Sequence, residues 1–176
     1  MTGKEFMNRV ANSKDDFLQA ILDILEETRT PFCAIGGLAV NAYAEPVVSL
    51  DLDIVILVEQ LDNVLIKLKE RYSVAEYPNS INVKEPTSDL RIQIQTDTRY
   101  QSFISRAVRK RILGYDIPAA AIEDVLQGKI WAAMDETRRA SKRQKDLSDI
   151  MRLVEAREDL ISLVPEILKN KLFPEK

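Results

Sequence analysis

The segment from Phe32 to Val58 restricts the fold of this chain more than any other part of the sequence. It begins with an apolar, strand-like stretch, and Gly36 and Gly37 follow at once. A second apolar stretch begins at Asp51, fourteen residues after Gly37. Glycine pairs suit tight turns, and the residues after this pair are numerous enough for a short helix. The segment therefore predicts two buried strands joined by a turn and a short helix, as in α/β proteins.

Two carboxylates stand at the start of the second predicted strand. Asp51 and Asp53 are two residues apart, and Ile54 to Val58 continue the strand with apolar side chains. Side chains alternate between the faces of a strand, so both carboxylates should point to the same side, about 7 Å apart. Carboxylates beside a glycine turn are typical of sites for a divalent metal ion and phosphate. We interpret the segment as a candidate site of this kind.

Each of these features also has a purely structural explanation. Gly36 and Gly37 can serve only as a tight connection between a strand and a helix. Asp51 can be a turn residue, and Asp53 can be a solvated charge at the edge of a strand. The order and spacing of the features together, rather than any one of them, favour the functional interpretation.

Composition limits the chemistry that is available to the chain. The sequence contains no histidine, which excludes Ser-His-Asp catalysis, Cys-His catalysis and histidine-ligated zinc. Cys33 is the single cysteine, and its place in a predicted buried strand indicates a core residue. One cysteine forms no disulfide within the chain, which fits a reducing cytoplasm. Metal or acid–base chemistry must therefore rest on carboxylates, lysine or tyrosine.

Length and hydropathy indicate a compact protein without a membrane segment. The 176 residues suit one domain, or one domain with a helical appendage, and 45% of them are hydrophobic. The sequence has no stretch of about 20 apolar residues, so we expect no membrane span and a cytoplasmic location. The net charge of −3 argues against binding nucleic acid through bulk charge, although it leaves room for a local basic patch.

The remaining pattern predicts a mixed sheet flanked by helices, α/β or α+β, and then a helical region. The spacing of apolar residues predicts helices over 14–28, 38–44, 61–72 and 101–108, and strands over 73–76, 80–84, 90–96 and 110–113. From Ala119 the sequence is almost entirely helical, with three apolar stripes, the third interrupted near Pro165. We expect residues 118–176 to form a helical bundle that packs on an α/β core of residues 1–117.

The glycine pair and the Asp-x-Asp together resemble the signature of the nucleotidyltransferase superfamily. The resemblance implies a nucleotidyltransferase-like mixed sheet flanked by helices. It also implies that Gly36, Gly37 and Ser49 lie against the phosphates of a nucleoside triphosphate. Asp51 and Asp53 would then be the catalytic carboxylates that hold Mg²⁺, or Mn²⁺.

The C-terminal half resembles abortive-infection-type (AbiEii-like) nucleotidyltransferases, over 118–129 and over 143–150, where the sequence reads RQKDLSDI. That resemblance implies that Lys129 reaches the nucleotide phosphates. It implies that Asp146 lies near the cleft, either as a site acid or as a partner for basic residues. Lys129 can equally be a surface lysine of an amphipathic helix. The basic side chains at 138, 139, 142, 143 and 145 form either a solvated face or a groove for triphosphate or RNA.

The predicted strand over 90–96 departs from the superfamily pattern. Active members carry a third carboxylate on such a strand, where it deprotonates or orients the attacking hydroxyl. Here the polar face carries Gln93 and Gln95 beside an arginine, and a glutamine is no base at neutral pH. Asp89 and Asp97 flank the strand and are the alternative third carboxylates. The departure bears on catalysis more than on fold.

Three functional hypotheses follow from these features. The leading one is a metal-dependent nucleotidyltransferase that moves a nucleoside monophosphate from a nucleoside triphosphate to a hydroxyl of RNA, a protein or a small molecule. The alternative is a non-catalytic nucleotide-binding or regulatory relative, acting through a partner protein in a toxin–antitoxin or defence pair. It is motivated by Gln93, a neutral side chain where a carboxylate is expected. The third, an RNA-binding scaffold, rests on the basic clusters alone.

Overall fold

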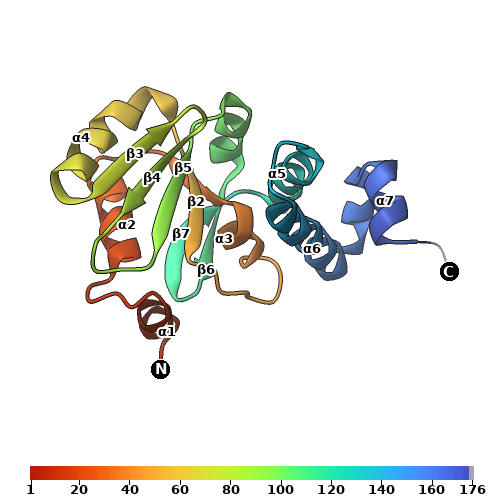
Figure 1. The fold of residues 1–176 in the computed structure, drawn as a ribbon, viewed down its shortest axis with the longest axis horizontal. Coiled ribbons are helices and arrows are strands. Elements are labelled where there is room, and N and C mark those ends of the chain that lie inside the picture. Colours follow the sequence, from red (N-terminus) through yellow and green to blue (C-terminus); the bar gives the residue numbers. More distant parts are fainter. Residues whose placement is uncertain (175–176) are drawn as a thin grey trace.

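The computed structural model describes residues 1–174, which form a seven-stranded mixed sheet with helices on both faces (Figure 1). The strands are β1 (Phe32–Ile35), β2 (Asp51–Ile56), β3 (Ser73–Tyr77), β4 (Ser80–Lys84), β5 (Arg91–Gln95), β6 (Val108–Ile112) and β7 (Tyr115–Ala119). The α-helices are α1 (Gly3–Val10), α2 (Phe17–Glu27), α3 (Gly36–Val40), α4 (Leu61–Arg71), α5 (Ile122–Met134), α6 (Ala140–Ala156) and α7 (Glu166–Leu172). The 3-10 helices are η1 (Val58–Gln60), η2 (Thr98–Arg106) and η3 (Glu158–Leu163). This is the mixed α/β fold that the sequence predicts.

The strand order places β2, with its two carboxylates, in the middle of the sheet. The order is β3-β4-β5-β2-β1-β7-β6, and β2 pairs antiparallel with β1 and parallel with β5. Parallel neighbours need a long connection, and here it contains α4 and the β3–β4 hairpin. In this register Asp53 lies opposite Ile35 of β1 and Gln93 of β5. The sheet thus brings the end of β1, the Asp-x-Asp and the polar face of β5 to one place.

The alternation of side chains along β5 decides which face borders the core. Ile92 and Ile94 are 0% and 1% exposed, whereas Arg91, Gln93 and Gln95 are partly exposed. The structure confirms the period-two pattern that the sequence shows for this strand. It therefore fixes which side chains of β5 can reach a cavity beside β2.

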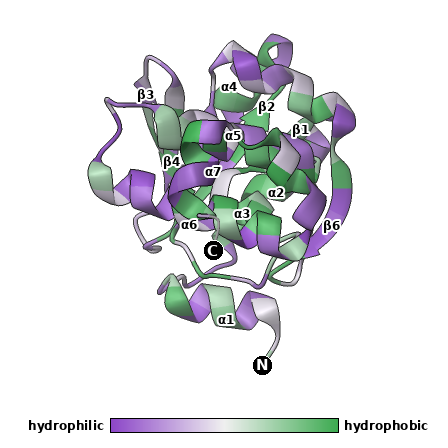
Figure 2. Ribbon diagram, turned by 90° about the vertical axis from the view of Figure 1, so that its right-hand side faces the viewer, coloured by the Kyte–Doolittle hydropathy of each residue, from purple (hydrophilic) through white to green (hydrophobic). Residues whose placement is uncertain are grey.

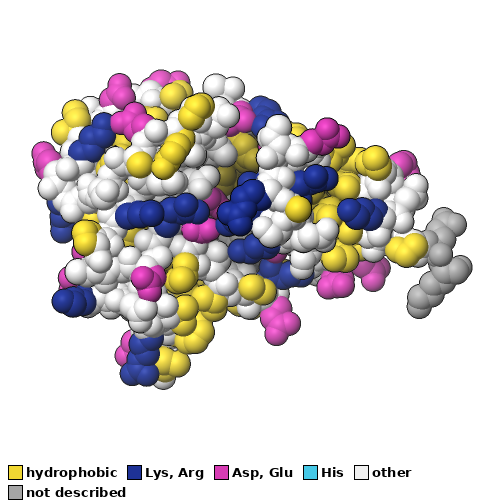
Figure 3. Space-filling view, viewed as in Figure 1, with side chains coloured by type: hydrophobic (Ala, Val, Ile, Leu, Met, Phe, Trp, Pro, Cys, Tyr) yellow, Lys and Arg dark blue, Asp and Glu magenta, His cyan; other side chains and the backbone are white. Residues whose placement is uncertain are grey.

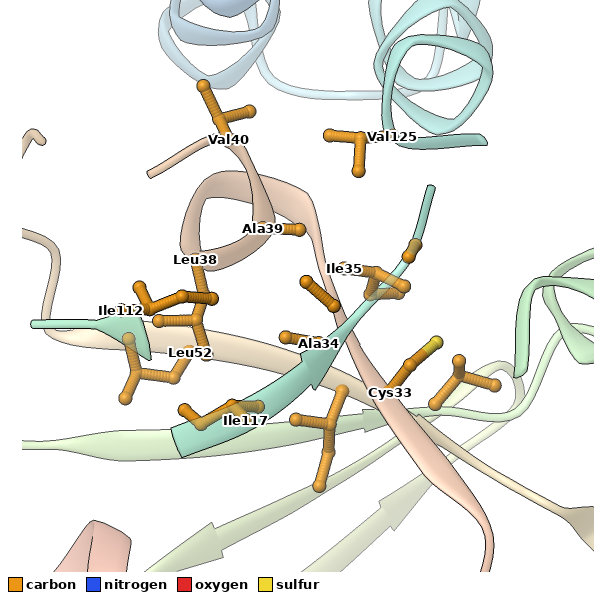
Figure 4. Close-up of a cluster of buried hydrophobic side chains, with 14 of the residues drawn as sticks. Cys33, Ala34, Ile35, Leu38, Ala39, Val40, Leu52, Ile112, Ile117 and Val125 are labelled. Carbon is orange, nitrogen blue, oxygen red and sulfur yellow. The ribbon is translucent and has the colours of Figure 1, made fainter. Parts of the chain in front are cut away.

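Helix α3 connects the sheet to the C-terminal helices. In Figure 1, α2 and α4 lie on one side of the sheet, and α3, α5 and α6 lie on the other, where α3 contacts both α5 and α6. Figure 4 shows Leu38 of α3 directed toward Leu52 and Ile112 of the sheet, while Val40 lies toward Val125 of α5. One apolar face of α3 therefore packs against the sheet, and another packs against the C-terminal helices.

Cys33 lies in the centre of this core. Its side chain is 0% exposed, and burial raises the pKa of the thiol to about 12. A thiol with such a pKa carries almost no thiolate at neutral pH, and the thiolate is the reactive form. The structure confirms that Cys33 is a core residue.

The outer strand β6 shows how one edge of the sheet is kept from pairing with another chain. It lies at the end of the strand order, and Figure 2 shows it strongly hydrophilic. Arg109 and Arg111 are exposed on this strand. Charged side chains on an edge strand discourage association of sheets. This basic cluster therefore has a structural role, and it lies apart from the residues that line the cavities described below.

Strand β7 was not expected from the sequence. The prediction ended the sheet with a strand over 110–113 and assigned Pro118 to the start of the helical region. In the structure Pro118 lies inside β7, opposite Arg109 of β6, and the next helix begins at Ile122. Proline is uncommon within a sheet because it lacks a backbone N–H. For this reason the sequence around Pro118 did not indicate a strand. The division into two domains at 117/118 stays a prediction.

Three expected helices also differ from the observed ones. The helix expected over 14–28 begins at Phe17, because the Asp16 side chain caps it by accepting a hydrogen bond from the N–H of Gln19. The segment expected as a helix over 101–108 is the 3-10 helix η2. Helix α3 begins at the glycine pair itself and ends at Val40, four residues before the predicted end. Pro165 does separate two helical segments, as expected.

Within residues 1–174, none of the helices is both long enough and apolar enough to cross a membrane.

We expect Ile92→Ala to lower the free energy of unfolding by about 2–5 kcal/mol, because it leaves a cavity in the fully buried face of β5. Ile66→Ala is the matched control, since Ile66 of α4 is 61% exposed and its truncation should change stability by less than about 0.5 kcal/mol. Urea unfolding followed by circular dichroism measures both. Equal losses for the two variants would contradict the register of β5.

Candidate nucleotide and metal site

Gly36 lies in close contact with Asp53, at the turn between β1 and α3. Gly36 has a φ of +60°, and a Cβ atom placed on it would lie 2.6 Å from Asp53 Oδ2. Both the backbone conformation and the contact therefore require glycine. A Cβ atom on Gly37 would meet nothing within 4 Å, so this residue leaves open space. The structural explanation of Gly36 is thus correct, and the tight turn it makes is built around a candidate site residue.

Asp51 is held by two cations from different parts of the chain. Arg91 of β5 donates from Nε to Asp51 Oδ1 at 2.9 Å, and its Nη2 lies 2.8 Å from the same oxygen. Lys142 of α6 donates from Nζ to Asp51 Oδ2 at 3.0 Å. Burial acts to raise the pKa of Asp51, but the hydrogen bond from Lys142 and the charge of Arg91 outweigh it and lower the pKa. Asp51 is therefore ionised and neutralised by side chains of the protein itself.

Asp53 differs from Asp51 in its bonding partners. Within residues 1–174 its carboxylate has no hydrogen bond or ion pair, although it lines two adjoining cavities. Burial raises the pKa of Asp53, and the charge of Asp51 adds to this, against the opposing charges of Lys129 and Arg138. An unpaired carboxylate in such surroundings destabilises a fold, so its presence needs a functional reason.

The first of the two cavities, which we call the charged cavity, is lined mainly by ionisable side chains. It is lined by Gly37, Ser49, Asp51, Asp53, Arg91, Gln93, Lys129, Arg138, Lys142, Lys145 and Asp146. Five cationic side chains therefore face three carboxylates. Figure 3 shows Lys and Arg side chains gathered across the middle of the molecule, between the sheet and the C-terminal helices, with carboxylates among them. The excess of positive charge suits an anionic ligand.

The second cavity, which we call the aromatic cavity, shares Asp53 and Gln93 with the first. Its other wall includes Tyr100 and Phe103 of η2, facing residues of α5. Tyr100 makes edge-on contacts with Phe103 and with Trp131, at ring-centroid distances of 5.3 and 5.4 Å. Burial raises the pKa of Tyr100 to about 12, so its hydroxyl stays protonated at neutral pH. This cavity therefore combines two aromatic rings with polar and charged side chains from β2, β5 and α5.

A chain of alternating charges closes the cavities on the side of the C-terminal helices. Lys129 of α5 lies between Asp146 and Asp149 of α6, with Nζ at 3.0 and 2.7 Å from their oxygens. Arg138 extends the chain from Asp146 at 2.7 Å, and Arg152 extends it from Asp149 at 2.7 Å. Burial alone would lower the pKa of Lys129, but the charges of Asp149 and Asp146 outweigh it and raise the pKa. Lys129 is therefore a buried, permanently charged side chain.

The same chain of charges reaches the connector that precedes β2. Arg152 donates to the Asn41 side chain and to the carbonyl oxygen of Glu45. The Asn41 amide in turn bonds both the carbonyl oxygen and the N–H of Val47, each at 2.9 Å. Two residues later, Ser49 Oγ accepts a hydrogen bond from Lys145 Nζ at 3.2 Å. Helix α6 therefore fixes the approach of the chain to Asp51.

The seven residues suggested for nucleotide or metal binding each line one of the two cavities. The structure places Gly36 at the aromatic cavity, Gly37, Ser49 and Asp51 at the charged cavity, and Asp53, Lys129 and Asp146 at both. The expectation that Asp146 partners basic residues is confirmed by its bonds to Lys129 and Arg138. The roles of these residues toward a nucleotide stay predictions.

The expected substitutes for a third carboxylate are not in these cavities. Asp89 accepts a hydrogen bond from Asn12, and Asp97 is paired with Arg99 in a neighbouring surface groove. The polar face of β5 does line the cavities, as predicted, with Gln93 opposite Asp53. Within residues 1–174 no group of three acidic, histidine or cysteine side chains is arranged to hold a metal ion. Of the three carboxylates that line the charged cavity, Asp146 is bound to Lys129 and Arg138, which leaves Asp51 and Asp53 as the candidate metal ligands.

Sequence reasoning missed two of the most important contacts. The ion pair of Lys142 with Asp51 was not predicted, because Lys142 belongs to a basic run that can equally form a solvated face. Asp149, which lies buried between Lys129 and Arg152, was not among the residues marked for the site. The signal for both was the spacing along one helix, since residues 142, 146 and 149 are four and three positions apart and so share a face of α6.

The fold defined by this sheet and these helices is that of nucleotidyltransferases. ANT(2'')-Ia in complex with adenylyl-2''-tobramycin matches it with a TM-score of 0.59 and 15% identity, over 88% of this chain and 94% of that one. The lincosamide antibiotic adenylyltransferase LnuA, bound to lincomycin, matches with a TM-score of 0.56 and 15% identity, over 80% and 98%.

An antigenic nucleotidyltransferase-like protein from Paracoccidioides brasiliensis also matches, with a TM-score of 0.51 and 15% identity, over 99% of both chains. A scan of family models and a search of curated proteins give no match to the sequence. At these identities the similarity is one of fold.

We expect Lys129→Met to lower the free energy of unfolding by about 3 kcal/mol, because it leaves Asp146 and Asp149 buried with less compensation. Arg138 and Arg152 still hold the two carboxylates, which keeps the loss at the lower end of the range for buried ion pairs. The loss should shrink as the pH falls from 8 to 5, since a poorly paired buried carboxylate has a raised pKa and takes up a proton.

The control for this prediction is Lys145→Met. It removes the same charge from an exposed position on α6, so stability should change by less than about 0.5 kcal/mol. Urea unfolding at several pH values measures both variants. A loss for Lys129→Met that does not depend on pH would show that packing, rather than charge, explains it.

Proposed function

We propose that this protein is a metal-dependent nucleotidyltransferase that moves a nucleoside monophosphate from a nucleoside triphosphate to a hydroxyl group. The observation that carries the proposal is the charged cavity. It combines Asp51 and Asp53 on one face of β2 with an excess of cationic side chains and the open backbone at Gly37. The shared fold with ANT(2'')-Ia and LnuA supports the proposal. So does the resemblance of the C-terminal motif to abortive-infection-type enzymes.

The donor set fits a hard divalent cation. Asp51 and Asp53 supply carboxylate oxygens, and Mg²⁺ is commonly held by one or two carboxylates together with substrate phosphates. Asp53 has no hydrogen-bond or ion-pair partner within residues 1–174, so its carboxylate oxygens are open to such a cation from the cavities it lines. When bound there, Mg²⁺ or Mn²⁺ would supply charge stabilisation for the phosphoryl group in transfer.

The other side chains of the charged cavity have roles that follow from charge and position. We assign Lys142, Lys145 and Arg91 to the phosphates, whose charge they can neutralise. Ser49 and the backbone at Gly37 can contact phosphate oxygens. Buried Lys129, held by its two carboxylates, adds positive charge to the cavity wall without leaving its position.

In the reaction, an acceptor hydroxyl oxygen forms a bond to the α-phosphorus, the bond from that phosphorus to the leaving pyrophosphate breaks, and the hydroxyl proton passes to the pyrophosphate or to solvent. Gln93, opposite Asp53, can orient that hydroxyl by accepting its hydrogen bond, but it takes no proton at neutral pH. We assign the acceptor to the aromatic cavity, which adjoins the charged cavity at Asp53. The named antibiotics of the structural neighbours favour a small-molecule acceptor, and the abortive-infection resemblance favours RNA or a protein.

A second function is favoured by one specific observation. Gln93 occupies the position where a third carboxylate would act, and the cavities contain no other candidate from β5. A protein of this kind can bind nucleotides without transferring them and act through a partner protein, as in a toxin–antitoxin or defence pair. Tight nucleotide binding without transfer to any acceptor would support this function over the first.

We expect Asp51→Asn and Asp53→Asn each to reduce nucleotidyl transfer by about 100-fold or more, because each removes a charge on which metal binding depends. The measurement is transfer of label from a mixture of α-³²P nucleoside triphosphates, with Mg²⁺, to RNA, proteins and hydroxyl-bearing antibiotics. Asp97→Asn is the control, since Asp97 lies outside the two cavities, and it should retain activity within a few-fold. Transfer that survives both site substitutions would refute the proposed roles.

We also expect Gln93→Asp to strengthen binding of Mg²⁺ or Mn²⁺ by about tenfold, because the number of charged ligands largely sets the affinity for hard cations. Gln95→Asp should have a smaller effect, since Gln95 lines the aromatic cavity alone. Calorimetry of each variant with Mn²⁺ gives the affinities. If Gln93→Asp binds metal no more tightly than the unchanged protein, the polar face of β5 does not contribute to the metal site.

A further inference from the structure

We propose that Lys142 and Arg91 act as exchangeable cations on Asp51, so that a metal ion enters this site with a polyphosphate rather than alone. The inference rests on the proposed function, because it takes Asp51 as a metal ligand. It adds a specific role for Lys142, and it identifies the ligand as a metal–polyphosphate complex rather than a free divalent cation.

Each carboxylate oxygen of Asp51 already has a cationic partner. Arg91 occupies Oδ1 through two nitrogen atoms at 2.9 and 2.8 Å, and Lys142 occupies Oδ2 at 3.0 Å. Asp53, two residues away, has no such partner within residues 1–174. One candidate ligand is therefore free and the other is blocked, and the blocking groups carry the same sign of charge as a metal ion.

Charge balance favours joint entry of metal and polyphosphate. The charged cavity already has two more cationic side chains than carboxylates. A lone divalent cation would add to that excess and would meet Lys142 and Arg91 at close range, where like charges repel strongly. A polyphosphate reverses the balance, since it attracts both side chains toward its own oxygens. Asp51 then becomes available for a metal ion.

The ion pairs on Asp51 are of a kind that can be exchanged at low cost. The side chains of Asp51, Arg91 and Lys142 are 32%, 31% and 39% exposed. Pairs with this exposure contribute little to stability, because water screens them. Lys129 differs, since it is 7% exposed between two buried carboxylates. The site therefore combines one fixed cation with cations that are free to move to a ligand.

Lys145 provides an internal comparison for Lys142. Both side chains lie on α6 and line the charged cavity, but Lys145 contacts Ser49 and not Asp51. Removing either one takes one positive charge from the same wall. If general charge alone governs metal binding, the two changes should have equal effects. If the ion pair of Lys142 with Asp51 governs metal binding, removing Lys142 should change the metal affinity more than removing Lys145.

The test measures binding of Mn²⁺ alone and of tripolyphosphate alone to the full chain. Electron paramagnetic resonance of free Mn²⁺ gives the first dissociation constant, and calorimetry without metal gives the second. We expect Lys142→Met to tighten Mn²⁺ binding by about tenfold and to weaken tripolyphosphate binding by about tenfold. Lys145→Met should weaken tripolyphosphate binding similarly but change Mn²⁺ affinity by less than about threefold. Lys67→Met, on α4, should change neither.

Lys142→Gln repeats the test with a polar side chain, and circular dichroism checks that each variant is folded. Unchanged or weaker Mn²⁺ binding in both Lys142 variants would overturn the inference, as would equal effects at Lys142 and Lys145. Failure of the inference is distinguishable from failure of the proposed function. Opposite shifts for Mn²⁺ and tripolyphosphate in a protein that transfers no nucleotide would support the exchange and reject the transferase.

Discussion

The buried contact of Lys129 with Asp146 and Asp149 is the interaction on which the arrangement of the site depends. It joins α5 to α6 inside the protein, and its outer members, Arg138 and Arg152, extend it to both sides. Buried charges are costly unless they are paired, so this cluster permits few alternative packings of the two helices. Arg152 then ties α6 to the connector before β2. The position of α6 relative to Asp51 is thereby fixed.

With α6 fixed, two kinds of side chain meet at the start of β2. Asp51 and Asp53 come from the middle of the sheet, and Lys142 and Lys145 come from one face of α6. The sheet register adds Arg91 and Gln93 from β5, and the tight turn at Gly36 makes room for the Asp53 carboxylate. The result is a cavity whose charge suits a polyphosphate and whose strand face suits a divalent cation. Neither part of the chain forms it alone.

Local sequence predicted the sheet side of this site well, for physical reasons. Two apolar stretches and a glycine turn predicted β1 and β2, although not their antiparallel pairing, and alternation in β5 distinguished Ile92 from Gln93 without any tertiary information. Strand β7 was missed because Pro118 is a weak strand former, and only its neighbours β1 and β6 stabilise it there.

The helical side of the site was harder to predict. The sequence marked Lys129 and Asp146 as candidates, but their burial depends on how α5 and α6 pack, which no local pattern specifies. A basic run has the same appearance on a solvated face and on a cavity wall. The contact of Lys142 with Asp51 joins residues 91 positions apart, so it becomes visible only in the folded chain.

The account makes one central claim, that Asp51 and Asp53 hold a metal ion together with the phosphates of a nucleotide. A crystal structure with Mg²⁺ and a non-hydrolysable nucleoside triphosphate tests it most directly. The account predicts Mg²⁺ about 2.1 Å from oxygens of both carboxylates, with Lys142 Nζ moved from Asp51 to a phosphate oxygen. A nucleotide bound away from the charged cavity, or one bound there with Arg91 and Lys142 still on Asp51 and no metal between the carboxylates, would contradict it.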